Sequence, residues 1–167
     1  MKRIMLAVFA LALVLAGSGC DDNDPVAPAE EHFEAEGLVL LSSGAELIRV
    51  FQGVVVTSVA EELEVPVGLS DHINVYFLDS DGERIDPPVH RDDHSLGWDI
   101  SDESLLEVVR GEAGHEDEEW EIHLRGLAEG ETEIEFQVLH VGHVDFRTPK
   151  IPVHIHGEGE DHDHDHE

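Results

Sequence analysis

Hydrophobic and polar residues alternate along several short stretches of the chain. Leu63, Val65 and Val67 alternate with acidic residues and a proline, and residues 120–124 and 134–138 repeat the same period of two. This period is typical of strands that bury one face, and no stretch shows a convincing helical period. Turn-forming residues separate the stretches at Ser43-Gly44, Gly53, Asp81-Gly82, Gly97, Gly126 and Gly130.

About eight or nine short strands at this spacing predict an all-β fold, an antiparallel β-sandwich over residues 32–156. Within it, residues 98–108 contain a Ser-Asp-Glu-Ser-Leu turn, residues 126–134 read GLAEGETEI, and a closing strand follows at 151–155. This order resembles bacterial Ig-like domains over roughly the last 60 residues of the region, and the resemblance implies a fold but no activity.

The first 20 residues have the pattern of an export signal. Lys2 and Arg3 precede an apolar run at residues 4–16, which is shorter than the roughly 20 residues needed to cross a bilayer. Small residues at 17–19 then lead to Cys20, and this junction resembles the lipobox of bacterial lipoproteins, except that Gly17 stands where the family prefers Leu. The resemblance implies cleavage after residue 19 and a lipid anchor on Cys20; an uncleaved anchor with a free thiol is the alternative. Both place the protein in the cell envelope, facing the periplasm or the exterior.

Two polar segments flank the predicted sandwich. Residues 20–31 contain acids, Pro and Ala with almost nothing to bury, so we expect a disordered tether. Residues 157–167 form a low-complexity tail rich in His and Asp, which we also expect to be disordered.

Charge excludes one class of function. Without residues 1–19 the chain keeps 7 basic residues against 39 acidic ones, a net charge of −32 with His neutral. Such a surface repels nucleic acid and concentrates cations. Acidity of this kind fits either cation binding or a salty habitat. Because Cys20 is the single cysteine, no internal disulfide can form, and stability must come from a core or a metal.

The 13 histidines cluster at places that a metal ion could use. On the closing strand, His154 and His156 should share the outer face, while the preceding segment carries His140, His143 and Asp145 around a turn at Gly142. We predict one metal site from these residues, with Asp145 as a ligand or as the partner that orients an imidazole. The reserve candidate ligand is His123. Solvated histidines on an acidic surface are the alternative.

Other histidines are weaker candidates. His90 and His94 follow Pro87-Pro88 in a predicted loop, and His32, His72 and His115 rank lower. In the tail, His162, His164 and His166 alternate with acids and resemble the His-rich segments of bacterial zinc, nickel and copper handling proteins, which implies weak, exchangeable capture. Imidazole and carboxylate ligands suit zinc first, then nickel or copper(II).

No catalytic pattern accompanies these residues, and we expect no enzyme. A Gly-x-Ser-x-Gly elbow is absent from the sequence. The stretch around Leu78 to Glu83 resembles a calcium loop, but with Gly82 at position six the twelfth position is Pro88, where the loop needs a Glu. Two functions remain. One is capture or buffering of a divalent metal outside the cytoplasm, with a metal transporter as possible recipient; the other is an Ig-like structural or protein-interaction module without a specific metal role.

Overall fold

Thirteen strands form the regular structure of residues 33–88, 93–110 and 120–157, the parts of the chain that the computed structural model describes. Several predicted features lie outside these residues: the predicted signal peptide, Cys20, the predicted tether, and the predicted tail with His162, His164 and His166. The same holds for His32, His90 and His115. The strands are β1 (Gly37–Ser42), β2 (Ala45–Phe51), β3 (Val54–Val55), β4 (Leu63–Pro66), β5 (Gly68–Leu69), β6 (Ile73–Leu78), β7 (Arg84–Ile85), β8 (His94–Ile100), β9 (Leu106–Arg110), β10 (Glu121–Gly126), β11 (Gly130–His140), β12 (His143–Arg147) and β13 (Ile151–His156).

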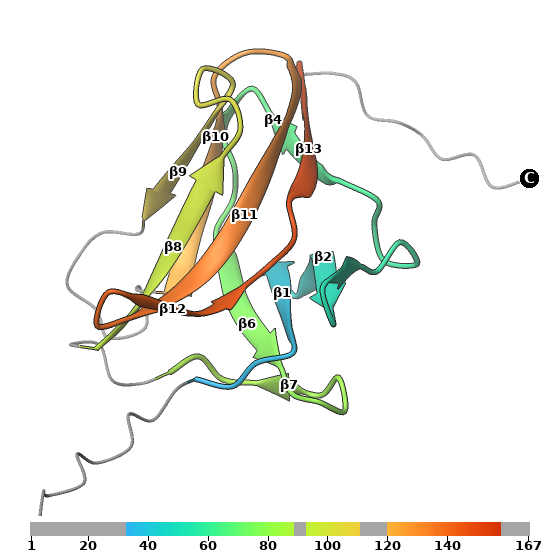
Figure 1. Ribbon diagram of the computed structural model, residues 1–167. Coiled ribbons are helices and arrows are strands. Elements are labelled where there is room, and N and C mark those ends of the chain that lie inside the picture. Colours follow the sequence, from blue (N-terminus) through green and yellow to red (C-terminus); the bar gives the residue numbers. More distant parts are fainter. Residues whose placement is uncertain (1–32, 89–92, 111–119, 158–167) are drawn as a thin grey trace, which may run out of the picture. The chain divides into compact units, whose positions relative to one another are not determined.

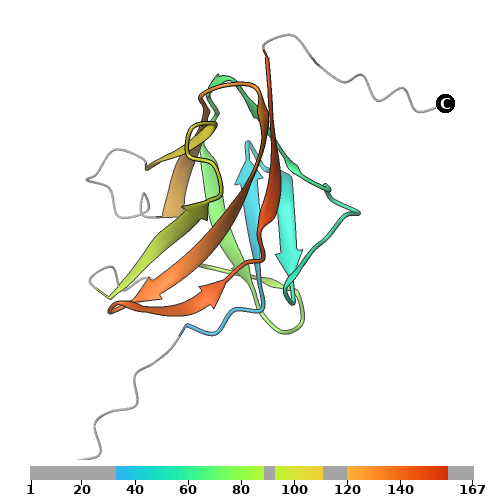
Figure 2. The same ribbon diagram turned by 45° about the horizontal axis from the view of Figure 1, so that its top comes forward.

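Twelve of these strands pair into two sheets, which confirms the predicted all-β sandwich. Sheet A has the order β3-β2-β1-β6-β10-β9, with β7 beside β6, and sheet B has the order β12-β11-β13-β4, with β8 beside β11. Figure 1 shows β11 and β12 of sheet B in front of β6 of sheet A, and Figure 2 shows the same fold with its top turned forward. Strand pairing is antiparallel except that β13 runs parallel to β4. The strand count exceeds the predicted eight or nine partly because β3, β5 and β7 have two residues each.

The core lies between the sheets and follows the alternation in the sequence. On β11 the fully buried apolar residues are Ile134, Phe136 and Val138, each 0% exposed, and Glu133 and Glu135 point away from the core. The closing strand β13 buries its alternate apolar residues in the same way, so its histidines lie on the outer face as predicted. Within the described ranges, no helix is long and apolar enough to span a membrane.

One predicted turn is wrong. Gly97 lies inside β8, where it pairs with Gln137 of β11. A Cβ atom on Gly97 would lie 3.0 Å from a side-chain carbon of Leu139, so this glycine provides room for packing across the ladder rather than a change of direction.

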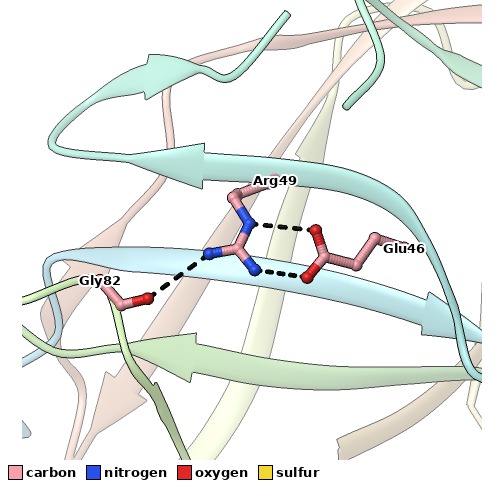
Figure 3. A network of polar contacts seen from close by, with 3 residues as sticks. All are labelled: Glu46, Arg49 and Gly82. Atoms are coloured by element: carbon pink, nitrogen blue, oxygen red, sulfur yellow. Dashed lines mark hydrogen bonds and ion pairs between the residues drawn. The ribbon is translucent and has the colours of Figure 1, made fainter. Parts of the chain in front are cut away.

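A small apolar cluster lies on the outer face of sheet A and contains Val39, Leu41, Leu78, Phe51 and Tyr76. Polar contacts lie beside it: Arg49 binds Glu46 through two guanidinium nitrogens and donates to the Gly82 carbonyl at 3.5 Å (Figure 3). The ladder between β1 and β2 shifts register at Leu40 and Leu41, and this bulge brings Glu46 to the same face as Arg49 although they are three residues apart.

Candidate metal site

Three histidines line up across the end of sheet B. His140, the last residue of β11, pairs with His94, the first residue of β8, and with His143, the first residue of β12. Residues directly opposite each other in antiparallel strands face the same side of a sheet. His140 follows Phe136 and Val138 in the alternation, so this side is the one that faces the core.

A tight hairpin holds β11 and β12 together. Its two central residues, Val141 and Gly142, have φ angles of 46° and 85°, as expected for a type I′ turn. Gly142 was predicted to allow this turn. A left-handed conformation is strained for a β-branched residue such as Val141, whose N–H donates to the Asp93 carbonyl at 2.9 Å. This bond ties the hairpin tip to the residue before β8.

A β-bulge directs Asp145 toward the histidines. Val138 pairs with Phe146 and Leu139 with Val144, so Asp145 is the extra residue on β12. A bulge re-aims a side chain that a regular ladder would hold on one fixed face. The Asp145 side chain is 2% exposed, and its Oδ2 atom accepts a hydrogen bond from the Phe33 backbone N–H at 2.9 Å.

The three side chains of His94, His140 and Asp145 form a compact group. Asp145 Oδ2 lies 3.4 Å from His140 Nδ1 and 3.7 Å from His94 Nε2, and one ligand atom from each residue lies within 4.8 Å of the others. The two imidazole rings stack face to face, with centroids 4.2 Å apart and an interplanar angle of 3°.

Burial of the His94 ring is energetically unfavourable in this group. His94 is 8% exposed, and among the described residues neither of its ring nitrogens has a hydrogen-bond partner. A buried polar group left in this state costs about 1–3 kcal/mol. Native structures rarely keep such a group without a compensating ligand or role.

Aromatic side chains surround this group on the core side. The Phe33 ring lies 6.5 Å from the His94 ring and 4.9 Å from Phe77, which also contacts Phe146 at 5.8 Å. An apolar surrounding of this kind excludes water and strengthens interactions between an ion and its ligands.

The ligand types in this group and the spacing of its ligand atoms suit a small divalent cation, but the orientation of its two rings does not. Zinc binds imidazole nitrogen and carboxylate oxygen at 2.0–2.2 Å, so ligand atoms around a tetrahedral ion lie about 3.3–3.5 Å apart. The distances from Asp145 Oδ2 to the two imidazole nitrogens are close to this value. Because the rings are parallel, their in-plane lone pairs do not converge, and binding requires one ring to rotate out of the stack.

The predicted joining of His154 and His156 to this site is wrong. His154 pairs with Glu131, the second residue of β11, whereas His140 is the last, nine residues or roughly 30 Å further along the strand. The two residues also lie on opposite faces of the sheet. Periodicity placed His154 correctly on the outer face, but the sequence does not show which end of a neighbouring strand that position meets.

His154 has its own acidic surroundings. Its Nδ1 lies 3.2 Å from Glu64 Oε2, and together with Glu62 these residues form a second group with ligand atoms within 4.8 Å. His156 is close by, with ring centroids 6.2 Å apart, but its Nδ1 faces the Gly157 carbonyl. On so acidic a surface, exposed groupings of this kind are expected without an ion.

The two other predicted ligands lie apart from the compact group. His143 is exposed at the hairpin, on the same sheet face as His140, and would have to swing inward to supply a fourth ligand. His123 lies on sheet A, with its Nδ1 2.9 Å from the Ser70 carbonyl and its ring 4.3 Å from that of His72. The reserve role of His123 in this site is therefore wrong.

His94 was underestimated because its segment was interpreted as a loop. The structure places it in β8, where His94, Leu96 and Trp98 share one face of the strand. This alternation is visible in the sequence and could have identified His94 as an inward-facing residue.

Comparisons with known proteins add little to this geometry. No family model matches the sequence, and no curated protein matches it. A solved structure, S-layer protein SbsC domains 4 and 5, is similar with a TM-score of 0.39 and 18% identity, covering 71% of this chain and 53% of that one. The present chain therefore spans about half the length of that structure. Because this similarity is so low, it carries no argument about function.

Proposed function

We propose that this chain is a lipid-anchored protein of the bacterial cell envelope that captures or buffers a divalent transition metal, with zinc as the first choice. The observation that carries the proposal is the buried His94 ring, whose nitrogens make no hydrogen bond among the described residues and which faces Asp145 and His140. An ion bound by these three residues would offset the cost of burying His94.

The ligand set favours zinc, nickel or copper(II) over harder ions. Two imidazoles and one carboxylate are intermediate ligands, whereas calcium and magnesium prefer oxygen alone. Three protein ligands leave a fourth position, which water or His143 can fill. An open coordination position allows the bound ion to exchange. A protein that passes the ion to a transporter requires such exchange.

The two ends of the chain would support metal capture by this site in different ways. The signal-like segment and Cys20 would hold the sandwich at a membrane, and the His-rich tail would bind the same class of ion weakly and raise its local concentration. The strongly acidic surface would also raise the local concentration of the metal ion.

Isothermal titration with Zn²⁺ tests the proposal on the full chain, a chain without residues 158–167, and a His94→Leu variant. We expect the tail deletion to keep one tight site and His94→Leu to weaken that site by about 100-fold or more. The matched control is His154→Leu, which removes an exposed histidine near two carboxylates and should leave the tight site unchanged. Loss of all binding on tail deletion would eliminate the ordered site, and no binding to the full chain would favour the interaction module.

A further inference from the structure

The segment before β1 reaches across the molecule to the candidate metal site. The Phe33 N–H donates to Asp145 Oδ2 over a sequence separation of 112 residues, at 2.9 Å. The same oxygen is the one nearest to both imidazoles. Phe33 therefore contacts the site through its backbone, at one of the three candidate ligands.

Further contacts fix this segment on the sandwich. The Glu36 N–H donates to the Leu78 carbonyl at 2.8 Å, and the Glu36 carbonyl accepts from Gln52 at 2.7 Å. The Phe33 ring packs edge-on against Phe77 of the core. Residues 33–36 are thus held at Asp145 on one side and at sheet A on the other.

A metal ligand needs a partner that orients it. A carboxylate oxygen can bind an ion and accept an N–H bond at the same time, and such orienting bonds commonly change metal affinity by about 10–100-fold. Asp145 is a bulge residue at the edge of its sheet, so the regular ladder does not fix its direction. The Phe33 N–H supplies that direction.

We infer that Phe33 is a positioning residue for the metal site, and that its backbone N–H couples occupancy of the site to docking of the N-terminal segment. This inference rests on the proposed function. Coupling is reciprocal: if docking of residue 33 tightens metal binding, the bound metal tightens docking by the same factor. Residue 33 directly follows the predicted tether. Metal binding to the domain would therefore change how firmly the segment next to the proposed membrane anchor is held on the sandwich.

Two substitutions of Phe33 separate the effect of its backbone N–H on metal binding from the effect of its ring. Phe33→Leu keeps the backbone donor and an apolar side chain, whereas Phe33→Pro removes the donor. In Zn²⁺ titrations of the full chain we expect Phe33→Leu to stay within about 3-fold of the parent and Phe33→Pro to bind about 10–100-fold more weakly. Equal losses in both variants would assign the effect to the ring and overturn the inference.

Amide hydrogen exchange in the unmodified chain gives a second readout that does not depend on the variants. Zn²⁺ should slow exchange at the Phe33 amide more than at the Val67 amide, which donates to the His156 carbonyl in the part of the fold formed by β4 and β13. If Zn²⁺ binds and the two amides respond alike, the coupling is wrong while the metal site stands. If Zn²⁺ does not bind to the parent chain, the proposed function itself fails.

Discussion

At the scale of single residues, His94 combines high burial with ring nitrogens that make no hydrogen bond within the described part of the chain. Both of its ring nitrogens are buried in a place where a regular core would hold a Leu or Phe. Natural proteins keep such locally unfavourable groups mainly at functional sites, where they lower stability in the absence of ligand.

His94→Leu should therefore stabilise the metal-free protein. In EDTA we expect the free energy of unfolding to rise by about 1–2 kcal/mol, because an unsatisfied buried group is replaced by an apolar one of similar volume. Zn²⁺ should raise the Tm of the parent and leave that of the variant unchanged. Thermal melts with and without Zn²⁺ measure both effects.

The control for this experiment is His123→Leu. This half-buried ring has a partner, the Ser70 carbonyl at 2.9 Å. Its removal should cost about 0.5–1.5 kcal/mol. Destabilisation by His94→Leu comparable to that of His123→Leu would contradict the interpretation of His94 as an unsatisfied residue.

The ion pair of Glu46 and Arg49 should make a contribution to stability that depends on pH. Hydrogen bonding to the Arg49 guanidinium holds the pKa of Glu46 below its ordinary value of 4.5. A lowered pKa in the folded state means that the pair stabilises the fold above pH 4.5 and that this contribution is lost as the pH falls through the lower, folded-state pKa. Because both side chains are partly exposed, the contribution should be below about 1 kcal/mol. Urea unfolding of the parent and Glu46→Gln should differ at pH 7 and converge at low pH; a difference that grows on acidification would contradict this assignment.

At the scale of elements, three hairpins use the same two-residue turn. Their central pairs are Ser43-Gly44, Gln52-Gly53 and Val141-Gly142, all with positive φ. Only the third has a β-branched first residue, and it is the one beside the candidate metal site. Val141 is 68% exposed, so packing does not compensate for its backbone strain.

Val141→Asn should stabilise the protein by about 1 kcal/mol, because Asn tolerates the left-handed conformation much better than Val. The matched control is Gln52→Asn, at the same turn position and likewise with an N–H that donates to a backbone carbonyl. We expect a smaller gain there, since Gln is not β-branched. Urea midpoints measure both changes, and equal gains would show that the strain is not specific to Val141.

Elements also show which features the sequence could predict. Alternation located β4, β10, β11 and β13 and the outward direction of His154, because side-chain direction in a strand depends only on local spacing. It could not locate the bulge at Asp145 or the pairing of His94 with His140, because both depend on register between strands that are distant in sequence. The contact from Phe33 to Asp145 is equally nonlocal. The predicted site therefore contained two of the three residues of the compact group, together with histidines from the other end of the sandwich.

At the scale of the whole molecule, acidic charge greatly exceeds basic charge. Ion pairs such as Arg125 with Glu107 at 2.8 Å and Arg147 with Glu135 at 3.2 Å neutralise only a small part of the 39 acidic residues. The remaining carboxylates repel one another in the compact state and attract cations to its surface. Repulsion of this kind opposes the packing of the two sheets.

Screening this repulsion should stabilise the fold. Raising NaCl from about 0.05 M to about 1 M shortens the Debye length from more than 10 Å to about 3 Å, so the urea midpoint in EDTA should increase while the m-value stays constant. KCl should have the same effect as NaCl, because screening depends on ionic strength and not on the identity of the cation. A strong preference for one cation would indicate specific binding, and a midpoint that falls with salt would show that attractive ion pairs outweigh the repulsion. The same screening should weaken Zn²⁺ capture by the surface more than by the buried group of His94, His140 and Asp145, since buried charges are screened much less.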